Sequence, residues 1–96
     1  MRALIVDPQV AGRLAIGEAP DPTPQLDQCL IRVEAVSLNR GEVQQVARAA
    51  PGTILGWDAA GTVVQAASRG GPAVGTRVVT NGARGGWAEL RAVNIA

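Results

Sequence analysis

The chain has 96 residues, which is the size of one modest domain with a single core, and a second domain does not fit. Nine arginines against eight acidic residues leave a net charge of +1, too weak a field to attract nucleic acid or an anionic membrane. No apolar run approaches the ~20 residues that span a bilayer, and residues 3–6 are shorter than the ~7–15-residue core of a signal peptide. We therefore expect a cytoplasmic location with no nucleic-acid or membrane partner.

The chain contains no histidine and a single cysteine. It cannot supply the three nitrogen or sulfur ligands that a catalytic zinc usually needs, so no metal site is expected. A serine–histidine triad, a cysteine–histidine dyad and a deaminase centre are excluded for the same reason. Cys29 cannot form an internal disulfide, and we interpret it as a small buried thiol in a strand.

The first part of the chain consists of short strand-like runs between glycines and prolines, as in an all-β barrel or sandwich. Residues 3–6 and 14–17 are predicted to form a hairpin around a turn at Gly12. Residues 20–24 contain three prolines, which lack a backbone N–H. We expect this stretch to run as an extended surface connection.

The clearest strand is predicted at residues 29–36, where apolar residues alternate with Arg32 and Glu34. The period then changes to i, i+3, i+4 and i+7, which predicts one buried face of a short helix ending at Pro51-Gly52. The apolar residues of this face are Val43, Val46, Ala47 and Ala50. Further strands are expected at residues 61–66, 76–80 and 87–93, with glycine-rich loops between them.

The junction at residues 37–44 is the first candidate site, because a strand passes into a helix there and polar side chains can emerge from a rigid frame. Asn39 is well placed to cap the helix, and Glu42 follows three residues later, as in a capping box. A cap and a ligand contact are compatible. The backbone carbonyl of an N-cap residue can bind the helix while its amide faces a ligand.

The second candidate is the segment at residues 56–61, in which small residues flank Trp57 and Asp58. A structural interpretation places Trp57 in a core that has no phenylalanine or tyrosine, with Asp58 bound by backbone or arginine groups. The chain has neither a P-loop nor a G-x-G-x-x-G motif, so no phosphate cradle is predicted. The two Arg-Gly-Gly triplets are too few for an RNA-binding tract, and we interpret them as turns.

Taken in order, these segments resemble the GroES-like N-terminal domain of the medium-chain dehydrogenase/reductase superfamily, especially its quinone oxidoreductase branch. The resemblance covers nearly the whole chain and is strongest at residues 1–4, 36–42, 56–64, 74–78 and 86–90. It implies that residues 1–96 form the substrate-side domain of an oxidoreductase. The implied fold is mainly β, a partly open β-barrel with one or two short helices.

The resemblance also assigns roles to the two candidate segments. In zinc-dependent relatives a cysteine ligand stands at the position of Asn39, and a histidine–glutamate pair stands at Trp57-Asp58. The chain therefore resembles the zinc-free branch, whose members transfer hydride from NADPH to quinones or activated alkenes. In that branch an asparagine matching Asn39 lies beside the nicotinamide.

The resemblance implies five further roles around Asn39, at Gln44, Arg40, Glu42, Trp57 and Asp58. Gln44 stands where many quinone reductases have a tyrosine, so its catalytic contact with the substrate is in doubt. Arg40 would contact the cofactor next to Asn39. Three residues would line the substrate cleft or hold its loops: Glu42, Trp57 and Asp58.

Family members continue into a Rossmann domain that holds NADP(H) or NAD(H), and that domain is absent from these 96 residues. We therefore expect this chain to supply one wall of the cleft, to hold no cofactor alone and to be inactive in isolation. The expected partners are a Rossmann domain and a small quinone or enone. A homodimer is compatible with this prediction. The alternative is a non-catalytic GroES-like module that binds itself or another chain.

Overall fold

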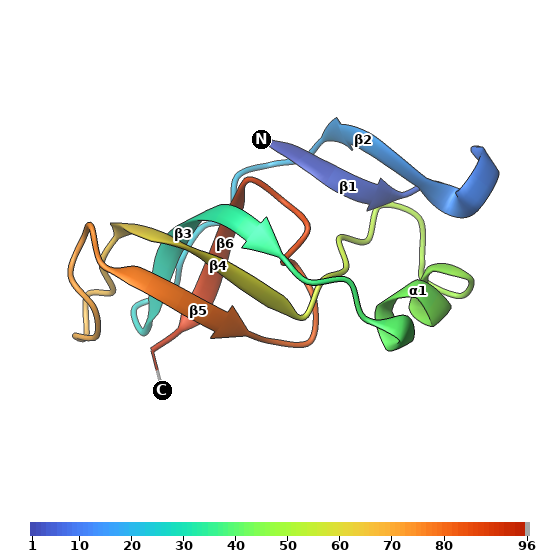
Figure 1. Cartoon of the computed structure of the whole chain (residues 1–96). Helices are drawn as coiled ribbons and strands as arrows, with labels where there is room; N and C mark the ends of the chain where they lie inside the picture. Colours follow the sequence, from blue (N-terminus) through green and yellow to red (C-terminus); the bar gives the residue numbers. More distant parts are fainter. Residues whose placement is uncertain (96) are drawn as a thin grey trace.

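The computed structural model describes residues 1–95 as a mainly β fold with one short α-helix (Figure 1). The strands are β1 (Arg2–Val6), β2 (Leu14–Glu18), β3 (Gln28–Val36), β4 (Asp58–Gln65), β5 (Arg77–Asn81) and β6 (Leu90–Asn94), and the helix is α1 (Arg40–Val46). None of the helices in this described part is long and apolar enough to cross a membrane.

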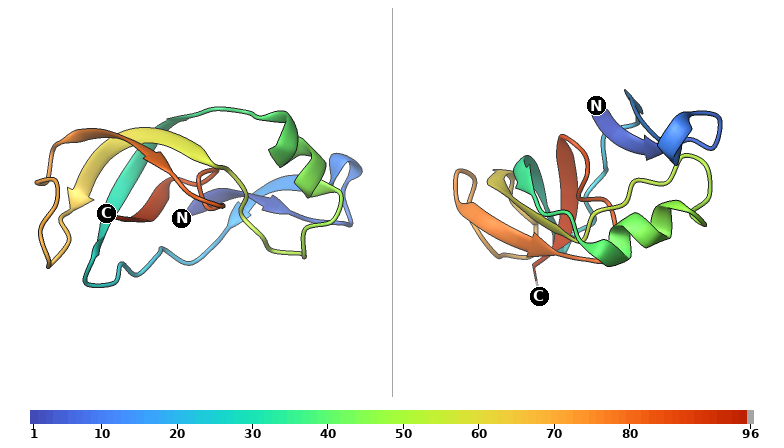
Figure 2. Two further views of the ribbon diagram at one scale, coloured as in Figure 1. Left: turned by 90° about the horizontal axis from the view of Figure 1, so that it is seen from below. Right: turned by 45° about the vertical axis from the view of Figure 1, so that its right-hand side comes forward.

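The strands form two antiparallel sheets. β1 and β2 pair as the predicted hairpin, with a 3-10 turn between them in which Gly12 has φ of 78°. The other four strands form a sheet in the order β5-β4-β3-β6. Figure 2 shows the hairpin beside this larger sheet rather than continuous with it, and no closed barrel forms within residues 1–95.

The segment at residues 87–89 joins the two sheets. It was predicted to be the start of the last strand, but β6 begins only at Leu90. The preceding residues instead leave the larger sheet and reach β1, where Ala88 forms a bridge to Ala3 and the N–H of Leu4 donates to the carbonyl of Trp87. The backbone groups of this stretch are thereby satisfied between the sheets, which shortens the strand.

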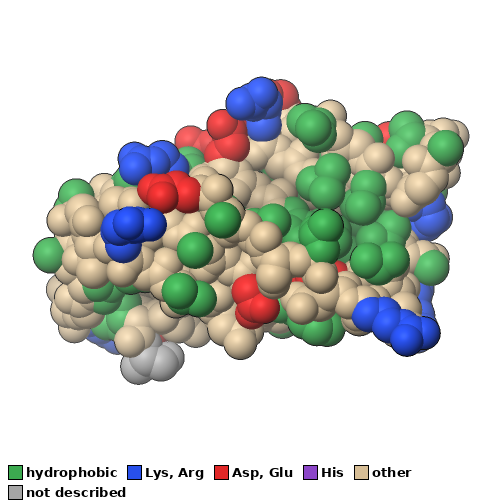
Figure 3. Space-filling model, in the orientation of Figure 1, with side chains coloured by type: hydrophobic (Ala, Val, Ile, Leu, Met, Phe, Trp, Pro, Cys, Tyr) green, Lys and Arg blue, Asp and Glu red, His purple; other side chains and the backbone are tan. Residues whose placement is uncertain are grey.

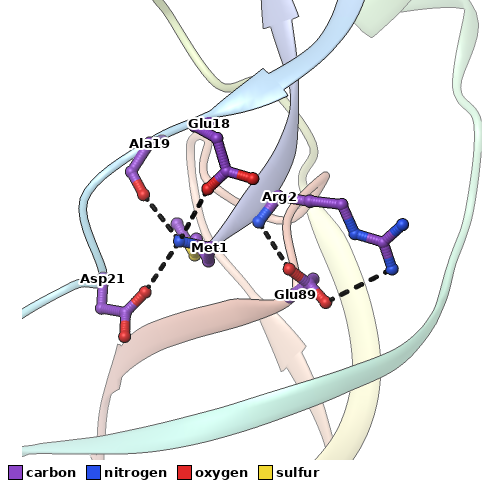
Figure 4. A network of polar contacts seen from close by, with 6 residues as sticks. All are labelled: Met1, Arg2, Glu18, Ala19, Asp21 and Glu89. Atoms are coloured by element: carbon purple, nitrogen blue, oxygen red, sulfur yellow. Dashed lines mark hydrogen bonds and ion pairs between the residues drawn. The ribbon is translucent and has the colours of Figure 1, made fainter.

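Polar contacts at the start of the chain reinforce this junction (Figure 4). The Arg2 N–H donates to a carboxylate oxygen of Glu89, and the Arg2 guanidinium lies 3.7 Å from the other oxygen. The Met1 ammonium lies 3.0 Å from Asp21 and 3.6 Å from Glu18. The hydrogen bond that this ammonium donates to Asp21 raises the pKa of the ammonium.

The apolar core consists of two separate clusters. One lies in the four-stranded sheet and contains Cys29, Ile31, Val63 and Ala67, which confirms Cys29 as a buried free thiol. The other lies under the hairpin and α1 and contains Val6, Val46, Leu55 and Trp87. The tryptophan of the core is therefore Trp87. The interpretation that placed Trp57 there was wrong, because Trp57 is only partly buried.

The helix differs from its prediction in both length and orientation. It ends at Val46, before the expected stop at Pro51-Gly52. Its buried residues are Glu42 and Val46, whereas Val43 is 61% exposed. The apolar period indicated a face rotated by about one residue, because the position facing the core at the start of the helix is occupied by a carboxylate with hydrogen-bond partners.

Candidate functional site

Glu42 brings the two candidate segments together. Its side chain is completely buried, and one carboxylate oxygen accepts hydrogen bonds from the backbone N–H of Asn39 at 2.7 Å and from the Asn39 side-chain amide at 2.9 Å. The other oxygen accepts the backbone N–H of Trp57. The predicted capping box is confirmed, and the same carboxylate also anchors a loop 15 residues further along the chain.

Ser37 extends this arrangement to Asp58. The Ser37 hydroxyl accepts a hydrogen bond from the Asn39 amide at 3.2 Å and donates one to the Asp58 carboxylate at 3.0 Å. We call the five residues Ser37, Asn39, Glu42, Trp57 and Asp58 the corner. The Asn39 amide has two N–H groups. Both N–H groups are therefore used inside the corner.

Arg91 also fixes the corner, although it was not among the site residues predicted from the sequence. It is 4% exposed and donates to the carbonyl of Trp57 at 2.9 Å and to the Thr80 hydroxyl at 3.0 Å. It also donates to the carbonyls of Gly56 at 3.5 Å and Arg84 at 3.2 Å. Burial lowers the pKa of Arg91, and the charges of Asp58 and Glu42 oppose that effect.

A sequence signal for Arg91 did exist. In the predicted strand at residues 87–93, Arg91 shares a face with Val93, and the structure pairs these residues with Ile31 and Cys29 of β3. An arginine on the apolar face of a strand must be paired or hydrogen-bonded. That pattern predicts a buried guanidinium, although it does not identify the acceptors.

Two grooves lie near Trp57, which lines the second of them. The helix groove, about 570 Å³, lies between α1 and the loop at residues 82–86, and Gln44 lines it. The Trp57 groove, about 580 Å³, is lined by Trp57, Asp58 and the same loop. The two grooves share Ala83. The indole also packs on Gly41, where an added Cβ would collide with the ring.

The structure thus places the predicted site residues in three different settings. Asn39, Glu42, Trp57 and Asp58 meet in the corner. Gln44 lies outside it in the helix groove, and Arg40 is exposed and lines neither groove. Within residues 1–95, no group of three or more histidine, cysteine, aspartate or glutamate side chains could hold a metal ion.

The donor set of the corner suits positioning more than proton transfer. The Glu42 carboxylate is occupied by three N–H donors, and Asp58 accepts from Ser37. The partly buried indole of Trp57 offers a flat apolar surface in the Trp57 groove. Such a surface can hold a planar ligand and exclude water around it.

Comparison with known proteins gives consistent matches to one family. The sequence pattern of the alcohol dehydrogenase GroES-like domain matches residues 25–94. An alcohol dehydrogenase superfamily protein from Novosphingobium aromaticivorans is 28% identical, with a TM-score of 0.80 over 98% of this chain and 32% of its own. A comparison with curated protein sequences gave no match.

Two further solved structures share the fold at lower identity. The human synaptic vesicle membrane protein VAT-1 homolog-like protein is 22% identical, with a TM-score of 0.89 over 99% of this chain and 33% of its own. The Escherichia coli quinone oxidoreductase, solved in complex with NADPH, is 19% identical, with a TM-score of 0.82 over 97% and 31%. The chain spans about a third of the length of these proteins.

Proposed function

The chain belongs to the family of alcohol dehydrogenase GroES-like domains in the medium-chain dehydrogenase/reductase superfamily, and from this premise we propose that it forms the substrate-side wall of a zinc-free, NAD(P)H-dependent oxidoreductase. The proposed substrates are quinones or enones. A Rossmann domain outside these 96 residues would supply the other wall of the cleft.

The corner is the observation that carries this proposal. By resemblance, zinc-dependent relatives hold metal ligands at the positions of Asn39 and Trp57-Asp58. Here these positions meet through Glu42, and they present an amide, an indole and one carboxylate. An amide and an indole are not the imidazole and thiolate ligands that zinc prefers. The residues at these positions therefore support a metal-free reaction.

The residues present fit the nicotinamide end of a cofactor better than its phosphates. Trp57 provides a flat, partly buried surface that lines one groove and packs on Gly41 of the other. The sequence offers no phosphate-binding motif. A bound nicotinamide would supply the hydride. The residues of this chain would hold the acceptor against the indole and exclude water, with Glu42 and Arg91 fixing the loops that form the wall.

The proposal is tested by expressing the reading frame that contains this chain through to its stop codon and measuring NADPH oxidation with 1,4-naphthoquinone. We expect oxidation that persists in the presence of a strong chelator, because the corner offers no zinc ligand set. Absence of oxidation, or loss of activity on chelation that zinc restores, contradicts the proposal. The isolated 96 residues serve as the control, and calorimetry should detect no micromolar affinity for NADPH.

A role of Asn39 beyond the cap is tested separately. In the complete polypeptide, Asn39→Ala should lower turnover, whereas Asn39→Ser, which retains a good neutral N-cap side chain, isolates the contribution of the amide. A reduced kcat in both variants supports a contact of Asn39 with the cofactor or acceptor. Unchanged kcat together with reduced thermal stability in Asn39→Ala limits the residue to the cap.

A second candidate function is a non-catalytic binding module, and an apolar surface favours it. A groove of about 500 Å³ runs between β1 and the end of β3 and is lined by Leu4, Ile16, Val36 and Leu38. Ile16 is 77% and Leu38 74% exposed. Figure 3 shows hydrophobic side chains gathered between the hairpin and α1. Light scattering of the isolated chain at high concentration tests self-association, and a monomer contradicts it.

A further inference from the structure

The helix groove is lined by positively charged residues that have no role in the proposed reaction. Its lining includes Arg48 from the turn after α1 and Arg84 from the loop at residues 82–86, together with the amide of Gln44 and the hydroxyl of Thr53. None of the eight acidic residues of the chain lines it. The groove therefore presents two cations and neutral polar groups, without a carboxylate to compete for an anion.

Arg48 and Arg84 are also free of internal partners. Among residues 1–95, the side chains of these two arginines make no ion pair and donate no hydrogen bond. Arg48 lies close to the carbonyls that end α1, but Arg13 binds these carbonyls instead, at Val46 and Ala49. Both guanidinium groups are consequently available to a ligand.

The backbones that carry the two arginines are well anchored. The loop of Arg84 is held by hydrogen bonds from Gly82 N–H to Trp57, from Gly85 N–H to Ile54 and from Arg91 to the Arg84 carbonyl, at 3.0, 2.9 and 3.2 Å. The turn of Arg48 is held by its own N–H, which donates to Gln45 at 3.1 Å. A groove whose backbone is fixed and whose two guanidinium groups are unpaired among the described residues is suited to a small anion.

The groove adjoins the corner. Gly41 lines the groove and packs against the indole of Trp57, and Ala83 lines both the helix groove and the Trp57 groove. The two arginines therefore line a groove that is continuous with the surroundings of the indole through Gly41 and Ala83.

We propose that the helix groove binds the anionic group of a small ligand of the reaction, a carboxylate or a phosphate, with Arg48 and Arg84 as the donors. This inference rests on the proposed function, and it narrows the substrate class to an acceptor with a carboxylate or assigns the groove to a phosphate of the cofactor. Guanidinium groups bind both kinds of oxyanion through paired N–H donors.

Binding to the 96-residue chain is measured first, because it does not require turnover. The probes are 4-oxo-2-pentenoate, its neutral methyl ester and inorganic phosphate, each titrated at low salt and followed by NMR of the arginine Nε–H groups. We expect the two anions to shift the signals of Arg48 and Arg84 and the ester to leave them unchanged. Arg48→Gln or Arg84→Gln should weaken anion binding by at least about 10-fold, as expected for one charge-assisted contact.

Arg69→Gln is the matched control, since Arg69 is exposed, lies in another glycine-rich loop and lines none of the three grooves. It should change the affinity less than 2-fold. Equal binding of the ester and the carboxylate, or equal weakening by Arg69→Gln, overturns the proposal.

Kinetics of the complete polypeptide then identify the source of the anion. If Arg48→Gln raises KM for the carboxylate acceptor but not for the ester, the groove binds the acceptor. If it raises KM for NADPH but not for NADH, the groove binds the 2′-phosphate. If neither KM changes, the site plays no part in the reaction and the proposal fails. If no acceptor is reduced at all, the proposed function fails, while the binding titration still decides whether the anion site exists.

Discussion

The two halves of the molecule are stabilised in different ways. The four-stranded sheet is held by antiparallel backbone ladders over a small apolar cluster centred on Ile31 and Val63. The other half, made of the β1–β2 hairpin, α1 and long loops, has an apolar cluster around Trp87 but also buries Glu42, and the buried Arg91 reaches its loops from β6 of the sheet. Within the corner, Glu42 accepts from Asn39 and Trp57, and Arg91 donates to Trp57. Ser37 joins Asn39 to Asp58.

This difference shows why the site lies where it does. A loop has few ladder partners for its backbone groups, so the groups that other backbone atoms do not reach need side chains that donate or accept. Arg91 binds carbonyls at Gly56, Trp57 and Arg84, and Glu42 binds the N–H groups of Asn39 and Trp57. The regular sheet is the frame, and the two buried ionic groups convert irregular loops into a rigid wall.

The largest effect is expected for Arg91→Met. The substitution keeps the apolar stem but removes every donor to the loop carbonyls, and it leaves Glu42 and Asp58 without their nearby cation. We expect a loss of about 4 kcal/mol in the free energy of unfolding, measured in urea. A loss below about 1 kcal/mol would mean that water replaces the guanidinium and that the corner does not depend on it.

Gly61→Ala tests the sheet half in the same units. A Cβ at Gly61 would collide with the backbone carbonyl oxygen of Arg32 in β3, which the hydrogen bonds between β3 and β4 hold in place. We therefore expect a loss of about 3 kcal/mol in the free energy of unfolding. Gly41→Ala is the matched substitution in the site half. There the Cβ meets the tip of the Trp57 ring, a side chain that can move, and alanine favours the helix.

We accordingly expect Gly41→Ala to cost no more than about 1 kcal/mol but to change the fluorescence of Trp57. Similar costs for the two alanine substitutions, or an unchanged emission spectrum in Gly41→Ala, would remove the contrast between a rigid ladder and an adjustable wall.

Glu42→Gln is expected to lower the free energy of unfolding by about 2 kcal/mol, because the NH2 group of the new amide faces N–H donors that now bind a carboxylate oxygen. Glu34→Gln is its control in the exposed face of β3 and should cost at most about 0.5 kcal/mol. Thermal unfolding of both variants followed by circular dichroism gives the comparison. Equal effects would show that burial of the carboxylate does not matter.

The smallest effect concerns the pH response of the sheet half. The Thr62 hydroxyl donates to Glu34 at 2.7 Å, and this bond, helped by Arg32, lowers the pKa of Glu34 below its ordinary value of 4.5. A carboxyl group whose pKa is lower in the folded chain stabilises the fold at pH values above its pKa in the unfolded chain. That stabilisation is lost as the pH falls through its pKa in the folded chain. In a carbon-detected NMR titration, Thr62→Val should raise the pKa of Glu34 more than Arg32→Gln does.

The sequence predicted the regular half well and the site only in part. Alternation in β3 and the turn at Gly12 identified the main strand and the hairpin, because these signals depend on near neighbours. The cap formed by Asn39 and Glu42 was also predicted, since its partners are three residues apart. The contact of Glu42 with Trp57 was not, because it joins residues that no local pattern relates.

By itself, the sequence determined a mainly β fold, a chain without histidine and a capped helix following the strand predicted at residues 29–36. Only the tertiary structure decided that Trp87 fills the core, that α1 buries Glu42 in place of Val43, and that Arg91 joins the loops. The physical reason is that a period reports which positions are apolar, whereas a buried charge is stable only where distant segments supply its hydrogen-bond partners.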